Sequence, residues 1–230
     1  MKRSLFFVLA LVAICVMPLY GQNPKSATTG TLNGHEWVDL GLPSGTLWAT
    51  CNVGANAPEE YGDYFAWGET NSKDIYNWET YKYANGDRDM IIKYCNDSDF
   101  GNDGFTDTLT ILLPEDDAAT VNWGSGWQTP SKEQWDELVG NTTKTWTTQN
   151  GVTGMLITAK NGVTLFLPAA GIRWDSNHKY EGADCVFWSR SLNSNYLCHA
   201  WYLLFDSEGC SLTGDNRFIG YSLRPVTTSR

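Results

Sequence analysis

The sequence predicts a single domain rich in short β-strands and loops, with one or two short helices. From His35 onward, short apolar runs alternate with Gly, Asn and Asp, a spacing typical of strands joined by tight turns. The 230 residues include 11 Trp, and large aromatic side chains at that density indicate a packed, β-rich core. A hydrophobic content of 42% argues against a disordered or fibrous chain, and the length suits one sizeable domain.

The early strands are predicted on either side of a turn. Residues 37–40 and 47–50 are apolar and aromatic, and they flank the Gly-Leu-Pro-Ser-Gly sequence at residues 41–45.

The clearest hairpin joins residues 155–160 to residues 163–167. Asn161-Gly162 lies between them and suits a two-residue turn whose central residues need positive φ. Further apolar runs are predicted as strands at residues 185–188, 200–205 and 221–226.

One helix is predicted to begin near Thr129, which can act as the N-cap ahead of Pro130 at the first helical position. A second, shorter helix is predicted over residues 115–121. The apolar residues of the first helix fall on one face, at Trp135, Leu138 and Val139.

Residues 1–21 have the order of a secretory signal peptide. Lys2 and Arg3 precede an apolar run over residues 5–16, and cleavage is predicted after Gly21. The run is too short to span a bilayer, which takes about 20 residues. Cys15 follows Ile14, whereas a lipoprotein signal needs a small residue there. We therefore expect an exported protein, in the periplasm, at the cell surface or secreted. Residues 22–33 are predicted as a flexible lead and residues 34–228 as the folded domain.

The charge excludes two classes of partner. The chain carries 16 Lys+Arg against 26 Asp+Glu, a formal charge of -10 with a pI near 4.7. Removing the signal peptide leaves 14 basic and 26 acidic residues, a charge of -12. Without a basic face the protein is not expected to bind nucleic acid or to dock on anionic lipid.

Five cysteines remain after cleavage at the predicted site. In an exported protein an odd number implies at least one free thiol or an intermolecular disulfide, and the sequence leaves the pairing open. No pair has CxxC spacing, so a zinc site is not predicted.

Eight short motifs resemble one known family when taken together. They are residues 38–49 (VDLGLPSGTLWA), 61–69 (YGDYFAWGE), 116–119 (DDAA), 122–124 (NWG), 127–131 (WQTPS), 167–171 (LPAAG), 187–189 (FWS) and 223–226 (LRPV).

The set is similar to the Fibrobacter succinogenes major paralogous (FISUMP) domain family, found in exported proteins of gut Bacteroidetes. That family is similar to the C-type-lectin-like fold, as are formylglycine-generating enzymes and the variable proteins of diversity-generating retroelements. The resemblance implies an α+β domain with a twisted antiparallel sheet, one or two short helices and long loops. It indicates the fold more than the function.

An acidic segment in the polar middle of the chain suggests a calcium site. An EF-hand alignment fails, because Gly101 and Thr110 stand where acidic ligands belong. Two interpretations stay open: a calcium site of another kind, or a solvated loop whose Asp and Asn residues form turns. The candidate ligands are Asp97, Asp99, Asp103 and Asp107, beside Asn102. No other cofactor is predicted.

No catalytic constellation stands out. Glu115, Asp116 and Asp117 are neighbours at a helix start, where acids are favoured by the helix dipole. Glycoside hydrolysis instead needs two carboxyls roughly 5–10 Å apart across a cleft. There is no Gly-x-Ser-x-Gly elbow, and no histidine has a nucleophilic partner by motif. The cysteine pair of the formylglycine-generating enzymes is not reproduced by Cys185, Cys198 and Cys210.

Tryptophans can bind sugar rings, but those in the family-like motifs are predicted to lie in the core or to anchor loops. They are Trp37, Trp48, Trp67, Trp123, Trp127, Trp135 and Trp188.

Residues 191–220 shift to an irregular mixture of Asn, Ser, Tyr, Leu, Gly, Cys and His. In the retroelement variable proteins this stretch forms a diversified binding face. Strand alternation predicts Trp201, Leu203 and Phe205 toward the core, with Tyr202 and Leu204 projecting outward. Exposed Tyr beside Asn, Ser and Asp suits recognition. The predicted ligand-binding residues are Asn193, Asn195, Tyr196, His199, Tyr202, Ser211, Thr213, Asp215, Asn216 and Phe218.

These observations favour a non-catalytic binding or adhesion domain that recognises a surface glycan or protein through its C-terminal loop face. The alternatives are a retroelement-diversified binding protein, a structural component of a surface assembly, and a carbohydrate-active or sulfatase-modifying type of enzyme.

Overall fold

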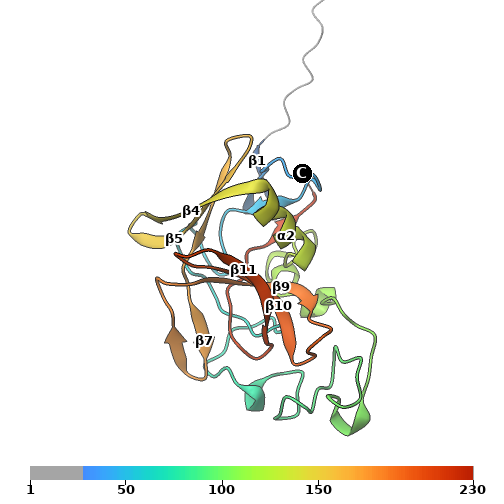
Figure 1. Ribbon diagram of the computed structural model, residues 1–230. Helices are drawn as coiled ribbons and strands as arrows, with labels where there is room; N and C mark the ends of the chain where they lie inside the picture. Colours follow the sequence, from blue (N-terminus) through green and yellow to red (C-terminus); the bar gives the residue numbers. More distant parts are fainter. Residues whose placement is uncertain (1–27, 230) are drawn as a thin grey trace, which may run out of the picture.

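The computed structural model describes residues 28–229 (Figure 1). Antiparallel strands in several sheets and two α-helices form an α+β architecture, as predicted. The predicted signal peptide and residues 22–27 of the predicted lead lie outside the described residues.

The elements follow one another with long irregular connections. The strands are β1 (Thr29–Leu32), β2 (His35–Val38), β3 (Leu47–Ala49), β4 (Thr142–Gln149), β5 (Val152–Ala159), β6 (Thr164–Pro168), β7 (Ile172–Trp174), β8 (Asn177–Lys179), β9 (Cys185–Leu192), β10 (His199–Phe205), β11 (Cys210–Asn216) and β12 (Val226–Thr227). The helices are α1 (Ala118–Trp123) and α2 (Lys132–Asn141), with short 3-10 turns η1 (Trp78–Thr80), η2 (Asn102–Gly104) and η3 (Pro114–Asp116).

The two ends of the described chain meet in one sheet, of order β1-β2-β3-β12. The prediction of a flexible lead is wrong for Thr29–Leu32, because this segment pairs with β2. Asn33 and Gly34 both have positive φ, as a two-residue hairpin turn requires. Gly30 lies against the indole of Trp37, where a Cβ would come within 2.3 Å of a ring atom. Of the predicted strand at residues 221–226, only the last residue falls in β12.

The sheet β11-β10-β9 lies between two hydrophobic clusters. In β9 and β10, even-numbered residues such as Trp188 and Ala200 belong to one cluster, and odd-numbered residues such as Phe187 and Leu203 belong to the other. Helix α2 packs against this sheet on the second side, as Figure 1 shows. Both faces of β10 are therefore covered over most of its length.

Helix α2 begins two residues later than predicted. Ser131 is its N-cap: the Ser131 hydroxyl accepts from the Gln134 backbone N–H at 3.3 Å, and the Gln134 side chain accepts from the Ser131 N–H at 2.8 Å. Trp135 and Leu138 are buried, which confirms the predicted apolar face. The Thr129 side chain instead donates to the Asp117 carboxylate.

Asp117 joins helix α1 to the segment that leads into α2. The Asp117 carboxylate caps α1 by accepting from the Ala119 N–H at 3.0 Å, and it also accepts from the Thr129 N–H and hydroxyl at 2.8 and 2.7 Å. Burial raises the pKa of Asp117, and the hydrogen bonds from Thr129 oppose that shift. The predicted helix over residues 115–121 is thus a 3-10 turn followed by α1, and these acids serve the fold.

The hairpin β5–β6 is confirmed, but its turn differs from the predicted one. Gly162 has a positive φ of 85°, whereas Asn161 does not. The Gly162 N–H donates to the Ala159 carbonyl at 2.9 Å, which makes a tight turn closed by a glycine in the left-handed region. Asn161 instead reaches Asp39, donating to its carbonyl at 3.0 Å.

The polar middle of the chain is held by buried tyrosines. Tyr76 and Tyr81 donate to the carbonyls of Tyr64 and Trp67 at 2.7 and 2.8 Å. Among residues 71–107 the structure shows no extended sheet, only isolated bridges. This segment folds because each tyrosine ring enters the core while its hydroxyl finds an acceptor.

Two further tyrosines converge on Asp116, which is almost fully buried. Its carboxylate accepts from Tyr83, from Tyr94 at 2.6 Å and from the Lys93 ammonium at 2.5 Å. Burial alone would raise the pKa of Asp116, but the hydrogen bonds from Lys93, Tyr83 and Tyr94 outweigh it and hold the pKa below its usual value.

The five cysteines of the described chain are all thiols. Cys51 is half-buried; Cys95, Cys185 and Cys198 are buried, and Cys210 is exposed. Burial raises the pKa of the Cys95 and Cys198 thiols, which keeps them protonated at neutral pH.

Replacing Ser131 with Ala should lower the free energy of unfolding by about 1 kcal/mol, because the helix loses its side-chain cap. Ser207→Ala, in an exposed loop, is the matched control and should leave stability unchanged. Urea unfolding followed by Trp fluorescence measures both. An equal effect of the two substitutions would show that Ser131 is not the functional cap.

Asp116→Asn should lower the free energy of unfolding at pH 7 by about 2 kcal/mol, because it removes the charge that Lys93 and the two tyrosines bind. The native pKa lies below the unfolded value of about 3.9. The stabilisation is therefore complete above about pH 4 and is lost as the pH falls below it.

The difference between the Asp116→Asn variant and the unchanged protein should accordingly shrink toward about pH 3. Asp99→Asn, on the exposed loop, provides the control. Unfolding curves measured across this range test the prediction, and a difference that stays constant with pH would contradict it.

Candidate functional site

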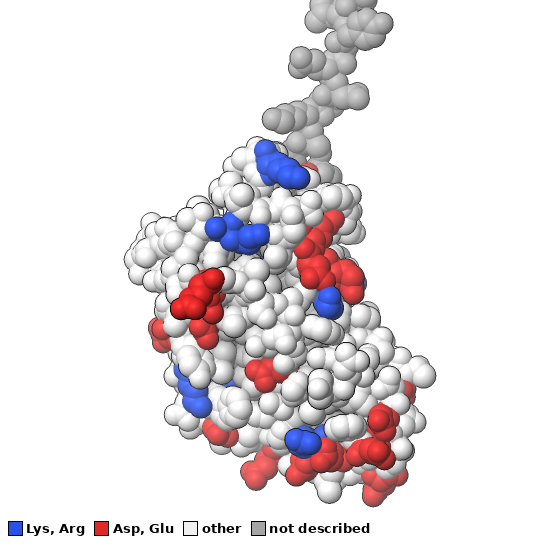
Figure 2. Space-filling model, viewed as in Figure 1, with Lys and Arg blue, Asp and Glu red and all other residues white. Residues whose placement is uncertain are grey.

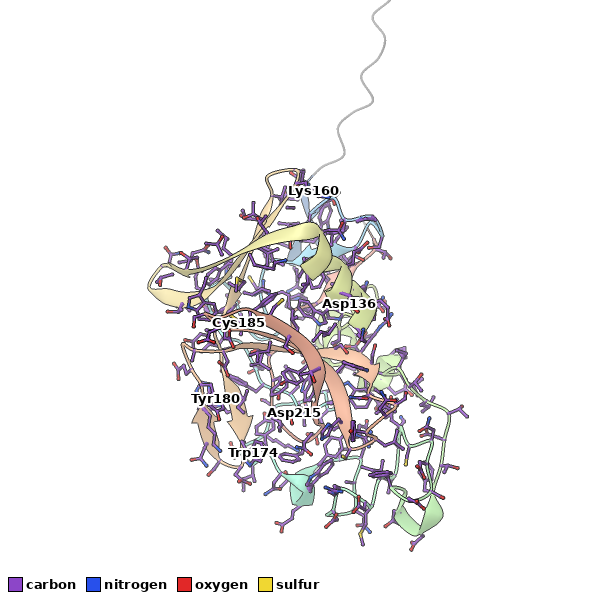
Figure 3. All side chains as sticks on the ribbon, viewed as in Figure 1. Asp136, Lys160, Trp174, Tyr180, Cys185 and Asp215 are labelled. Carbon is purple, nitrogen blue, oxygen red and sulfur yellow. The ribbon has the colours of Figure 1, made fainter. Side chains whose placement is uncertain are left out.

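The predicted binding residues come from β10, β11 and the segments on either side of this strand pair. In Figure 3, Asp215 lies near the middle of the viewed face. Strand β11 is the outer strand of its sheet. The structure divides the ten residues into three groups: one face of the strand pair, the turn before β10 with the adjoining strand ends, and the buried interior.

The first group lies on one face of β10–β11. Tyr202 stands directly opposite Thr213, and Leu204 stands opposite Ser211. Because alternate residues share a face, Asp215 lies on this side as well. Ser211 and Thr213 are exposed. We call Tyr202, Ser211, Thr213 and Asp215 the strand-pair face.

Tyr202 does not project freely, as the sequence predicted, but is half-buried. Its ring centroid lies 6.1 Å from that of Trp188 and 5.1 Å from that of Tyr221. Burial raises the pKa of Tyr202 to about 12, with the charges of Asp215 and Asp184 adding to the shift. The hydroxyl therefore stays neutral at physiological pH, on a ring fixed by its neighbours.

Hydrogen bonds hold the Asp215 carboxylate in place. The buried hydroxyl of Tyr221 donates to one Asp215 oxygen at 2.6 Å, and the Asn216 N–H donates to the other at 2.7 Å. Two more carboxylates follow the same face: continuing the β9–β10 register places Asp184 opposite Asp206. Burial raises the pKa of Asp184, and the charge of Asp206 raises it further. The strand-pair face is thus aromatic, hydroxylated and acidic.

Figure 2 shows that most of the viewed surface is uncharged, with separate acidic groups across it. Acidic side chains gather most densely at the end that carries the long middle loop. Over residues 82–107 of that loop, the exposed acids are Asp87, Asp89, Asp97, Asp99 and Asp103.

The second group lies in the turn before β10 and at the adjoining end of the strand pair, where His199 faces Asn216. Tyr196 is 62% exposed, and its ring centroid lies 5.7 Å from that of His199. Asn195 is exposed and Asn216, across from His199, is half-buried. Burial lowers the pKa of His199, although the charge of Asp215 acts in the opposite direction. This histidine is therefore neutral near pH 7.

Two predicted binding residues are buried, and their assignment to a surface is wrong. Asn193 is 6% exposed, and its side-chain oxygen accepts from the Asn195 N–H at 3.1 Å. Phe218 is 5% exposed, with its ring centroid 5.1 Å from that of Trp78 and 5.4 Å from that of Trp174. The chain turns inward after β11, so an apolar side chain at this position enters the core.

The alternation predicted along β10 is correct, but Tyr202 and Leu204, predicted to project outward, are partly buried against the other hydrophobic cluster. Leu203 and Phe205 are buried as predicted, but Trp201 is only half-buried. The β9–β10 register shifts between Ala200 and Tyr202, which leaves Trp201 beyond the packed part of the sheet. There the Lys132 ammonium covers its ring, 5.0 Å from the centroid.

The proposed calcium ligands are not gathered. The Asp107 carboxylate accepts from the backbone N–H groups of Tyr94, Cys95 and Leu109 at 2.7–3.0 Å. Asp97 accepts from the Asp99 N–H at 3.0 Å, as in a turn. Across residues 28–229, no three His, Cys, Asp or Glu side chains come close enough to hold a metal ion.

The histidines contact aromatic rings and backbone. His35 stacks on Trp123 with a ring-centroid distance of 3.8 Å, and His178 lies 2.9 Å from the Tyr64 hydroxyl and 3.0 Å from Glu181. In the described part of the chain, none of the three histidine side chains hydrogen-bonds to a Ser or Cys side chain.

The prediction that the motif tryptophans lie in the core is confirmed. Each is at most 7% exposed: Trp37, Trp48, Trp67, Trp123, Trp127, Trp135 and Trp188.

One feature was missed at the sequence level. A cleft of about 460 Å³ is formed by residues 62–64, residues 72–76 and Arg173 in the middle of β7, with Ser176 beside it. No local motif marks it, because three distant segments supply its walls.

No protein-family model, characterised protein or solved structure matches this chain. Within residues 28–229, no helix combines the length and apolar character needed to cross a bilayer.

Phe218→Ala should lower the free energy of unfolding by about 3–5 kcal/mol, because it leaves a cavity between two indole rings. Tyr196→Ala, at an exposed position, should change it by less than about 0.5 kcal/mol. Thermal and urea unfolding of the two variants measure the difference. Similar stabilities would show that Phe218 lies at the surface.

Proposed function

We propose that this chain is an exported, non-catalytic binding protein that holds a surface protein or glycan on its strand-pair face. The observation that carries the proposal is the position of Tyr202. Its ring is fixed by Trp188 and Tyr221, and it stands opposite the exposed Thr213 on an outer strand. A fixed aromatic beside exposed hydroxyls offers contact area at little cost in side-chain entropy.

The charge of this face favours a basic partner. Asp184, Asp206 and Asp215 lie along it, and the whole chain is strongly acidic. Such a face attracts Lys and Arg side chains, which also interact favourably with tyrosine rings, and it repels anionic glycans. We therefore propose a protein surface rich in Lys and Arg as the first ligand to test.

Tyr196 and His199 extend the proposed site beyond the strand pair. Tyr196 is the most exposed large aromatic side chain of the described residues, and its ring leans on that of His199. Aromatic side chains of this kind are enriched among residues that dominate binding energy.

We further propose that the chain is a FISUMP-type domain with a C-type-lectin-like fold. The α+β architecture supports this proposal, as do the buried positions of the motif tryptophans. The motif at residues 116–119 has a clear structural use, since Asp116 and Asp117 both bind neighbouring segments. Export is proposed from the signal-peptide pattern of residues 1–21.

Thr213→Arg should weaken ligand capture at least tenfold, because it adds a long cation to the centre of the acidic strand-pair face. The probe is an array of purified surface proteins and glycans, read with and without EDTA. Capture by the unchanged protein should also weaken as NaCl is raised, since charge pairs at an exposed rim are screened.

Thr145→Arg provides the matched control, because Thr145 is an exposed residue of another outer strand, β4. It should leave capture intact, and both variants should keep the melting temperature of the unchanged protein. Equal loss in the two variants, or an array that stays blank in every condition, would overturn the proposal. Loss of capture in EDTA would show a role for a divalent cation.

A further inference from the structure

The cleft at Arg173 lies apart from the strand-pair face and shares no residue with it. At about 460 Å³ it is in the range of sites that hold small molecules. Its walls carry charged groups of both signs. The charged and aromatic side chains that line it include Asp63, Asp74, Arg173, Tyr64 and Tyr76.

Hydrogen bonds hold the three wall segments in place. Residues 76 and 175 exchange a pair of backbone hydrogen bonds at 3.0 and 2.8 Å. The Tyr76 hydroxyl donates to the Tyr64 carbonyl at 2.7 Å and accepts from the Lys73 N–H at 3.2 Å. Arg173 exchanges backbone hydrogen bonds with Gly220 at 2.8 and 2.9 Å. The cleft is therefore a fixed part of the fold.

The Arg173 guanidinium lies 5.0 Å from the centroid of the Tyr64 ring. Stacking of this kind orients the guanidinium and leaves its N–H groups directed sideways. Its N–H groups make no hydrogen bond or ion pair with any residue of the 28–229 range. Lys73, the other cation at the cleft, is occupied by Glu69 and the Thr80 carbonyl, each at 2.9 Å.

Two carboxylates balance Arg173. Asp63 and Asp74 line the same cleft, are exposed, and form no ion pair or side-chain hydrogen bond with the described residues. With Lys73 neutralised by Glu69, the cleft presents one cation and two anions without protein partners. A ligand with a net negative charge would be repelled by both carboxylates. A ligand that carries one negative and one positive group can pair the first with Arg173 and the second with a carboxylate.

We propose that the Arg173 cleft binds a small zwitterion that carries a carboxylate and an ammonium group, such as a free amino acid. The ligand carboxylate accepts two parallel N–H bonds from one edge of the Arg173 guanidinium, the bidentate geometry that such pairs favour. The ammonium pairs with Asp63 or Asp74. A stacked sugar ring does not fit, because the Tyr64 and Tyr76 rings are buried and offer no open face.

Isothermal titration of the full chain against the common L-amino acids tests this site. We expect saturable binding of at least one of them with a Kd below about 1 mM. Its N-acetyl derivative, which lacks the ammonium, and its amide, which lacks the carboxylate, should each bind at least tenfold more weakly. Glucuronate, which carries a carboxylate and hydroxyls but no ammonium group, is tested separately and should not bind.

Arg173→Gln should weaken binding of the amino acid at least tenfold, while Arg88→Gln removes the same group from an exposed loop and should leave it unchanged. The double variant Asp63→Asn with Asp74→Asn tests the ammonium contact and does not depend on Arg173→Gln folding. The proposal would be overturned if no amino acid binds saturably or if these variants leave binding unaffected. It would also be overturned if the blocked derivatives bind equally well or if glucuronate binds. Thr213→Arg should leave this binding intact, which separates the cleft from the strand-pair face.

Discussion

The charge on the buried Asp116 carboxylate is the constraint on which the irregular half of the molecule depends. Tyr83, Tyr94 and Lys93 all approach it from one long segment that has no sheet of its own. The next residue, Asp117, binds the start of α1 and the backbone of Thr129. Two adjacent side chains thus connect the irregular middle to the helical part. A buried charge is stable only when several donors surround it. The Asp116 carboxylate therefore requires Tyr83, Tyr94 and Lys93 to take up these positions.

The sheet β9–β10–β11 has the corresponding role in the regular half. Because both of its faces are covered, the side chains of β9 and β10 have little freedom to repack. The outer strand β11 is the part that reaches solvent. Tyr202 lies at the boundary between the two environments: its ring belongs to the packed region, and its strand partner Thr213 is exposed. This boundary explains how a chain with so few exposed aromatics can present one in a fixed orientation.

Local patterns in the sequence were sufficient where structure depends on near neighbours. The apolar face of α2 and the β5–β6 pairing follow from spacing along the chain, whereas the burial of the motif tryptophans was predicted from the family-like motifs that contain them. The errors involve distant partners. Phe218 was predicted at the surface, but its ring packs between Trp78 and Trp174, which are distant in sequence. Asn161 lacks the predicted turn geometry, and its side chain donates to the Asp39 carbonyl. The Arg173 cleft could not be foreseen for the same reason, since its walls come from separate segments. Asn33-Gly34 carried a usable hairpin signal, but residues 22–33 are polar and small and were therefore predicted as a flexible lead.

Strands β1 and β12, from the two ends of the described chain, form the two edges of one sheet, and this arrangement has a mechanical consequence. Tension applied at Thr29 and Thr227 would act first on the sheet β1-β2-β3-β12, whose two edge strands contain these residues. Strand β12 is two residues long, so few hydrogen bonds resist its removal from β3. Under pulling, this short strand would detach first and extend the chain by a small amount. The strand-pair face and the Arg173 cleft lie outside that sheet and would keep their shape during this first extension.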